Sequence, residues 1–153
     1  MIIYRLWQCT WGCLQTILGL ILFLINIKNE HFSYHGSIVT KWKAKSSVSL
    51  GMFIFITDEP YFADKFKGEL TNDDLFNRLL VHEYGHTVQS LIFGPLYLII
   101  MGIPSTLWGF IPSLARKRRD RQLSYFSFFT EKSANRLGER ITKEKSMEEL
   151  VID

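Results

Sequence analysis

Two histidines and a glutamate with the spacing of a metal site lie in the sequence His82-Glu83-Tyr84-Gly85-His86. In a helix, residues four apart project from the same face, so both imidazoles can reach one metal ion. Zinc accepts such nitrogen ligands together with a third protein ligand, and a catalytic site keeps one position open for water. Glu83 lies beside the histidines, where its carboxylate can take a proton from that water. The pattern predicts a hydrolase with Zn²⁺ as its cofactor.

The region around these residues has the pattern of a helix. Thr71 or Asn72 can cap its start, and the aspartates at 73–74 suit the positive end of the helix dipole. Apolar residues then recur at helical spacing until Gly94-Pro95, which ends the helix. The alternative is two ordinary helical histidines with a salt-bridging glutamate. The placement of the motif in the middle of a well-capped helix favours the metal site.

A third ligand is expected among the acids that follow. Asp120 lies between arginines, and four further acids lie in or beside a polar tail, namely Glu144, Glu148, Glu149 and Asp153, with Glu139 just before it. Glu131 instead follows apolar aromatic residues in FFTEKSANRLG, which favours a buried helix and makes it the predicted ligand. Asn135, one helical turn later, can hydrogen-bond a ligating histidine. The alternative for Glu131 is an acid that caps the first turn after Thr130.

The two motifs together, H-E-x-x-H and then E-x-x-A-[ND]-R ending at Arg136, resemble the membrane-associated gluzincins. This group contains the HtpX-like and CAAX prenyl proteases, and the resemblance extends over residues 75–138. It implies hydrolysis of peptide bonds at a zincin-type helix, with Glu131 as the third zinc ligand. It also implies that Asn135 supports a histidine, at a position where the family has an acid. For the group that stabilises the oxyanion, Arg136 and Tyr84 are candidates.

Two apolar blocks indicate contact with a membrane. Residues 1–28 contain LQTILGLILFLINI, preceded by Trp7 and Trp11, which predicts an N-terminal transmembrane helix as an anchor. A cleaved signal peptide is the alternative, but no small-x-small cleavage site follows. The second block, in the apolar segment 94–114, is interrupted by Gly102 and Pro104. A single crossing there would separate His82 from Glu131, so we expect an apolar re-entrant helical hairpin or an interfacial segment. An apolar core segment is the alternative.

The region between the anchor and the motif has the pattern of β-strands. SIVTKWK alternates apolar and polar residues, and VSLGMFIFIT is rich in β-forming residues, so together they predict a short β-hairpin, with a pair of strands as the alternative. An edge strand beside a peptidase site can pair with an extended substrate. The candidates for this substrate strand are Leu50, Gly51, Met52, Phe53, Ile54 and Phe55, and an ordinary core strand remains equally open.

The predicted organisation is therefore α+β and mainly helical. It comprises an anchor at 1–28, a metallopeptidase-like domain at 29–142 that ends in the ligand-bearing helix from about 122 to 138, and a polar tail at 143–153. Cys9 and Cys13 give no disulfide framework. The net charge of +3 gives no reason to expect a nucleic-acid partner.

The distribution of basic residues predicts the orientation in the membrane. On the motif side of the anchor lie Lys28, Lys41, Lys43, Lys45 and the cluster Arg116, Lys117, Arg118, Arg119 and Arg121. The positive-inside rule then makes the catalytic side of this integral membrane protein cytoplasmic. We expect membrane lipid and a peptide or membrane-protein substrate as partners. A non-catalytic membrane protein with a structural zinc site or an interaction role is the alternative, which does not need Glu83.

Overall fold

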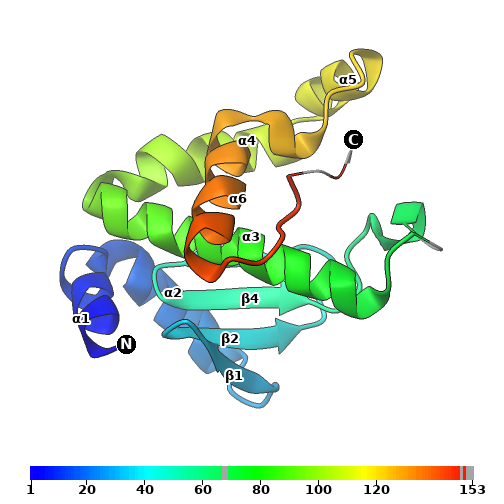
Figure 1. Cartoon of the computed structure of the whole chain (residues 1–153). Helices are drawn as coiled ribbons and strands as arrows, with labels where there is room; N and C mark the ends of the chain where they lie inside the picture. The colour runs from blue at the N-terminus through cyan, green and yellow to red at the C-terminus, as the bar shows by residue number, and fades with distance from the viewer. Residues whose placement is uncertain (67–68, 149, 151–153) are drawn as a thin grey trace.

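The computed structural model, which describes residues 1–66, 69–148 and 150, is an α+β fold of helices packed with one small mixed sheet (Figure 1). This confirms the predicted α+β, mainly helical class. The elements in chain order are α1 Ile2–Thr10, α2 Cys13–Ile25, β1 His31–Tyr34, β2 Ser37–Trp42, β3 Val48–Leu50, β4 Phe53–Thr57, η1 Ala63–Phe66, α3 Asn72–Phe93, η2 Gly94–Leu96, η3 Leu98–Gly102, α4 Ile103–Phe110, α5 Pro112–Asp120, η4 Tyr125–Ser127 and α6 Phe129–Thr142.

The sheet has the strand order β1-β2-β4-β3. β1 and β2 form an antiparallel hairpin through His35-Gly36, and β3 and β4 form a second one through Gly51. The two runs that were expected to pair as one hairpin instead lie parallel to each other, as β2 and β4. The reason is local: Gly51 has a φ of 60°, which reverses the chain inside VSLGMFIFIT and divides that run into two strands.

Strand β4 lies inside the sheet, and all five of its residues are buried. Its side chains alternate between the two faces, so Ile54 packs with the core under α3 while Phe53 meets Phe23 of α2. Phe53, Ile54 and Phe55 pair with β2 on one side and β3 on the other. These three substrate-strand candidates are therefore core residues, and of the six candidates only Leu50 lies on an edge strand, β3.

The two N-terminal helices are bent by 103° at Trp11-Gly12. In the described residues, no single helix combines the length and the apolar character needed to cross a membrane. Two bent pairs reach that length and composition together, namely Ile2–Thr10 with Cys13–Ile25, and Asn72–Leu96 with Leu98–Phe110. The transmembrane anchor stays a prediction. Cys9 and Cys13 are free and exposed.

Buried amide side chains connect α1 and α2 to α3. Gln8 donates from Nε2 to the carbonyl oxygen of Thr87 at 2.9 Å and accepts from Ser90 Oγ at 2.9 Å. Gln15 donates from Nε2 to Ser90 Oγ at 2.8 Å and to the carbonyl oxygen of Gly94 at 3.0 Å. Both glutamines are fully buried. The N-terminal helices therefore share an interior with the helix that carries the motif.

The apolar segment after α3 turns earlier than expected. The chain bends by 119° between α3 and the helix that begins at Leu98, next to Gly94 with its φ of 51°. Leu98–Phe110 then continues through Gly102 and Pro104, so the reversal expected near these residues is wrong. The π-helical turns of Leu98–Gly102 allow this, because their wider spacing accommodates a proline that has no N–H to donate.

The C-terminal part packs more closely than its polar sequence suggests. α6 begins at Phe129, later than expected, because the preceding residues form the short helix η4. Beyond α6, Ser146 and Met147 are buried, and Arg78 Nη1 donates to the carbonyl oxygen of Ser146 at 3.1 Å. The predicted polar tail is thus packed around residues 146–147, and its residues 149 and 151–153 lie outside the described part.

The basic cluster divides into one buried and four exposed residues. The Arg118 guanidinium lies 4.9 Å from the ring centre of Trp108 and 5.6 Å from that of Tyr125, and it donates to the Trp108 carbonyl oxygen. Cation–π contacts of this kind attach α5 to α4 and to η4. Arg116, Lys117, Arg119 and Arg121 remain exposed.

Candidate metal centre

The candidate centre lies where α3 and α6 cross. Two glycines permit the close approach: a β-carbon on Gly85 would lie 1.9 Å from the carbonyl oxygen of Ala134, and one on Gly138 would lie 2.2 Å from that of Val81. The helix start is as predicted, with Thr71 and Asp74 in a reciprocal capping box. α3 also ends at Gly94 as predicted.

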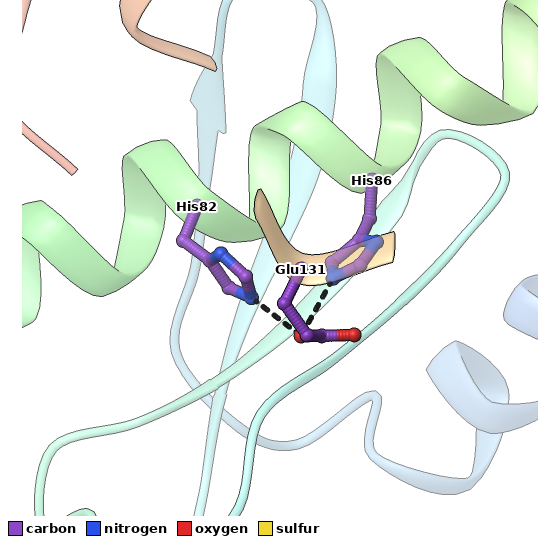
Figure 2. A group of neighbouring side chains, drawn as sticks. All are labelled: His82, His86 and Glu131. Carbon is purple, nitrogen blue, oxygen red and sulfur yellow. Dashed lines mark ion pairs between the residues drawn. The ribbon is translucent and has the colours of Figure 1, made fainter. Parts of the chain in front are cut away.

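His82, His86 and Glu131 converge at this crossing (Figure 2). Glu131 Oε2 lies 3.3 Å from His82 Nε2 and 3.5 Å from His86 Nε2. A tetrahedral zinc ion with bonds of about 2.0–2.1 Å separates its ligand atoms by about 3.4 Å. All three residues are buried. The geometry and the donor set therefore fit one zinc ion held by two imidazoles and a carboxylate.

Each histidine is oriented through its other ring nitrogen. His82 Nδ1 lies 2.8 Å from Asn135 Oδ1, and His86 Nδ1 lies 2.8 Å from Gln89 Oε1. Gln89 in turn donates from Nε2 to the Thr130 carbonyl oxygen at 2.8 Å. An amide oxygen can only accept, so each Nδ1 carries a proton, and each Nε2 is the ring nitrogen that faces the centre and can bind a metal.

Asn135 lies where the sequence motif predicted a supporting residue, and its surroundings are unusual. Its Oδ1 also accepts from the backbone N–H of Met147 at 3.3 Å, which fixes the orientation of the amide. Its Nδ2 is buried and has no hydrogen-bond partner in the described part of the chain. A carboxylate at this position would accept the same two hydrogen bonds without leaving a donor unsatisfied.

Charges in the metal-free centre form a buried pair. Burial alone lowers the pKa of His86, but the neighbouring Glu131 carboxylate outweighs burial and raises it to about 9. Burial likewise raises the pKa of Glu131, yet the His86 charge and the hydrogen bonds from both histidines hold it well below its usual range. At neutral pH His86 is therefore protonated in the metal-free centre, and the binding of a divalent metal ion would release this proton.

A cavity of about 980 Å³ opens on the centre. α3 contributes His82, Glu83 and His86 to its lining, and the edge strand β3 forms one wall. The opposite wall comes from the apolar helix Leu98–Phe110, and Tyr97 and Tyr125 line the same space. The arrangement brings a candidate base, three candidate ligands and a free strand edge to one cavity.

Several residues of this site were not predicted from the sequence. Ser49 on β3 donates from Oγ towards Oε2 of Glu83 at 2.7 Å, a contact between segments 34 residues apart. Gln89 could have been found, since it follows His86 by three residues on the same helix face. Tyr97 and Tyr125 are tyrosines whose pKa is raised by burial and then by the Glu83 and Glu131 charges, so both keep their hydroxyl protons.

The two residues named for the oxyanion lie elsewhere. Arg136 is largely exposed and pairs with Glu148 at 3.2 Å. Tyr84 packs among Tyr4, Tyr34 and His35, away from the cavity lining. Both assignments are wrong because α3 turns the side chain after Glu83 towards the sheet, and because Arg136 lies on the outer face of α6.

No model of a protein family, no curated protein and no solved structure matches this chain. Function must therefore be argued from the chemistry of the site.

Proposed function

We propose that the protein is a zinc-dependent, membrane-associated peptidase. The observation that carries the proposal is the convergence of three buried ligand atoms within 4.8 Å of one another, beside Glu83 and in a cavity. The resemblance of both motifs to membrane-associated gluzincins supports the same assignment. His82, His86 and Glu131 hold the metal, and Asn135 and Gln89 keep the two imidazoles in the binding tautomer.

The roles of the side chains follow from their chemistry. When bound, zinc supplies a Lewis acid that makes water a nucleophile near neutral pH. Glu83 takes the proton of the attacking water and then delivers it to the leaving amine. Tyr97 and Tyr125, which keep their protons, replace Arg136 and Tyr84 as candidate donors to the oxyanion.

The cavity suits an extended peptide. β3 pairs only with β4, so the backbone groups on its outer edge can pair with a substrate strand along the cavity wall. Leu50 remains a substrate-strand candidate on β3, and Gly51 and Met52 form the turn that follows it. The substrate class is a peptide or a membrane protein with an accessible extended segment.

Association with membrane lipid is supported by the apolar side chains that the fold leaves exposed. α2 exposes one apolar face, and the helix after Gly94 exposes another, with Ile103 53% and Phe110 77% accessible. Exposed apolar surface of this extent is typical of membrane-binding proteins. The exposed arginines and lysine of α5 suit anionic headgroups and, by the positive-inside rule, a cytoplasmic catalytic side.

A lipid-binding experiment tests this part. Purified protein is mixed with phosphatidylcholine vesicles, with or without phosphatidylglycerol, and floated on a density gradient. We expect flotation with both, and a loss of flotation when Ile17 and Ile21 on the exposed face of α2 are replaced by glutamate. Leu75→Ala, a core change that affects stability but no exposed face, is the control. Flotation of the double variant like the wild type would contradict lipid binding through α2.

The alternative function is a structural zinc site in a non-catalytic membrane protein. Its specific support is Asn135, an amide where the resembling family has an acid. Such a site needs the three ligands but makes no use of Glu83, which lines the cavity beside them. The two functions therefore predict different results for a Glu83 variant: a peptidase would lose peptide cleavage, whereas a structural zinc site would be unaffected.

The deciding experiment measures the metal content of purified protein and its cleavage of a peptide library by mass spectrometry. Wild type should carry about one zinc per chain and cleave a subset of peptides. His86→Ala should lose both zinc and cleavage, whereas Glu83→Gln should keep zinc and lose cleavage. A wild type without zinc would exclude both functions. Zinc with no cleavage in any sample would favour the structural site.

A further inference from the structure

We propose that Ser49, on the edge strand β3, is the positioning residue for the base Glu83. The inference rests on the proposed function, and it assigns a role to a strand residue that the zinc-binding motifs do not contain. Ser49 Oγ lies 2.7 Å from Glu83 Oε2 and 2.8 Å from the Glu83 carbonyl oxygen. Both residues are 5% exposed, so the contact is largely shielded from bulk solvent.

The single proton of the Ser49 hydroxyl is donated to the carboxylate. An O–H bond to an ionised oxygen is shorter and about twice as strong as one to a neutral oxygen, and 2.7 Å lies at the length expected of the charged kind. The Glu83 carbonyl lies in the middle of α3 and has a helical N–H partner of its own. The carboxylate is therefore the acceptor that gains most from the hydroxyl.

This contact distinguishes the two carboxylate oxygens of Glu83. Oε2 is held by Ser49, and among the described residues no other side chain hydrogen-bonds the Glu83 carboxylate. Oε1 is thus the oxygen left to receive the proton of the attacking water and to return it to the leaving amine. Holding one oxygen fixes the rotation of the carboxylate, which a proton transfer over hydrogen-bond distance requires.

The strand that carries Ser49 is held in place by close packing against α2. A β-carbon on Gly19 of α2 would lie 2.4 Å from the carbonyl oxygen of Leu50, and one on Gly51 would lie 2.7 Å from the Thr16 α-carbon. On the other side, Ser49 is paired with Ile54 of β4. Backbone therefore packs on backbone at β3, and the position of the hydroxyl is set by the fold rather than by a flexible loop.

Acetohydroxamic acid, a small zinc-binding probe, tests the position of the base without a known substrate. A hydroxamic acid binds zinc as its anion and gives its proton to a neighbouring base, so its affinity reports whether the carboxylate can accept that proton. The variants are Ser49→Ala, Ser49→Thr, which keeps the hydroxyl, and Ser49→Val, which has the shape of threonine without it. Zinc content is measured for each, followed by the Kd of the probe by calorimetry.

We expect about one zinc per chain in all four proteins. The wild type and Ser49→Thr should bind the probe with similar Kd. Ser49→Ala and Ser49→Val should bind about tenfold more weakly, because a Glu83 carboxylate that is free to rotate is less often in position to receive the proton of the probe. Equal affinity of Ser49→Val and Ser49→Thr, or a zinc-loaded wild type that does not bind the probe, would overturn the role of Ser49. A wild type without zinc would refute the proposed function itself, and with it this inference.

Discussion

The carbonyl oxygen of Ala134 lies where a side chain on Gly85 would have to be, 1.9 Å from the ideal β-carbon position. Gly85 is one of the two variable positions of the H-E-x-x-H motif, yet here its identity is fixed by the partner helix. Because a larger residue would separate α3 from α6, the distance from Glu131 to both histidines depends on this glycine. The geometry of the candidate metal centre and the packing of the two helices are thus set by the same contact.

Replacing Gly85 with alanine should therefore remove zinc as well as stability. The obstacle is backbone, which cannot rotate away, so we expect a loss of about 1–3 kcal/mol in the free energy of unfolding and zinc content well below one per chain. Denaturant unfolding and metal analysis of the purified variant test this. Gly102→Ala is the matched control, since its β-carbon would meet nothing closer than 3.5 Å. Normal zinc content in Gly85→Ala would contradict the role of the close crossing.

Asn135→Asp should bind zinc more tightly than the wild type. The aspartate would accept from His82 Nδ1 and from the Met147 N–H, remove the unsatisfied Nδ2, and place negative charge behind a ligating imidazole. We expect at least a tenfold lower Kd for zinc, measured by competition with a chromophoric chelator. Asn135→Leu, which cannot accept, should weaken binding. An aspartate variant that binds more weakly than wild type would contradict this account of the amide.

Zinc binding at pH 7.5 should release a proton from His86. Its pKa of about 9 in the metal-free protein means that the imidazole is charged at this pH and must lose its proton to coordinate. Calorimetry in buffers of different ionisation enthalpy counts the protons released. We expect a contribution of about one from His86 at pH 7.5 that disappears as the pH rises above 9. The same heat in all buffers at pH 7.5 would contradict a protonated His86.

The metal-free protein should also lose stability as the pH rises. The folded pKa of His86 lies above its ordinary value of 6.5, so its proton stabilises the fold. That stabilisation is complete below pH 6.5 and is lost progressively as the pH approaches 9. Thermal unfolding of chelator-treated protein between pH 6.5 and 9 measures the trend, with His86→Gln as the control that should lack this component. A wild type with the same slope as His86→Gln would contradict it.

Gln15→Leu should destabilise the protein although it makes the helix more apolar. The change removes two buried hydrogen bonds, from Gln15 Nε2 to Ser90 Oγ and to the carbonyl oxygen of Gly94, each with a net contribution of about 0.5–1.5 kcal/mol. A lower midpoint of denaturant unfolding is the expected result. Leu18→Gln, at an exposed position on the same helix, is the control for a change of polarity alone. A midpoint equal to that of the wild type would contradict the buried contact.

Local signals in the sequence predicted most of the candidate centre. These signals act within a few residues: the histidine spacing, the Thr71 cap and the glycine at position 94. The structure places the helix between the two predicted ends. Glu131 and Asn135 were found because a helical period relates them to each other. The structure brings these residues together with His82 and His86, while the metal, the reaction and the membrane remain predictions.

Contacts between distant segments could not be predicted. No local pattern encodes that β2 and β4 pair in parallel. Ser49 was not predicted for this reason, since its contact with Glu83 exists only because β3 packs against α3 in the folded chain. Gln15 lies in a run apolar enough to suggest a membrane span, but its partner is 75 residues away.

The buried contacts of Gln8 and Gln15 have a consequence for how this protein could be regulated or handled. A leader that only tethers a catalytic domain can be cut off to shed an active, freely diffusing enzyme. Here the amide groups of α1 and α2 donate to carbonyl oxygens of the motif helix and of the residue that ends it, and α2 packs against the strand beside Glu83. Cutting after residue 28 is thus expected to disrupt the candidate centre instead of releasing it intact. A form that stays in solution without detergent would instead require replacement of the exposed apolar residues while both glutamines are kept.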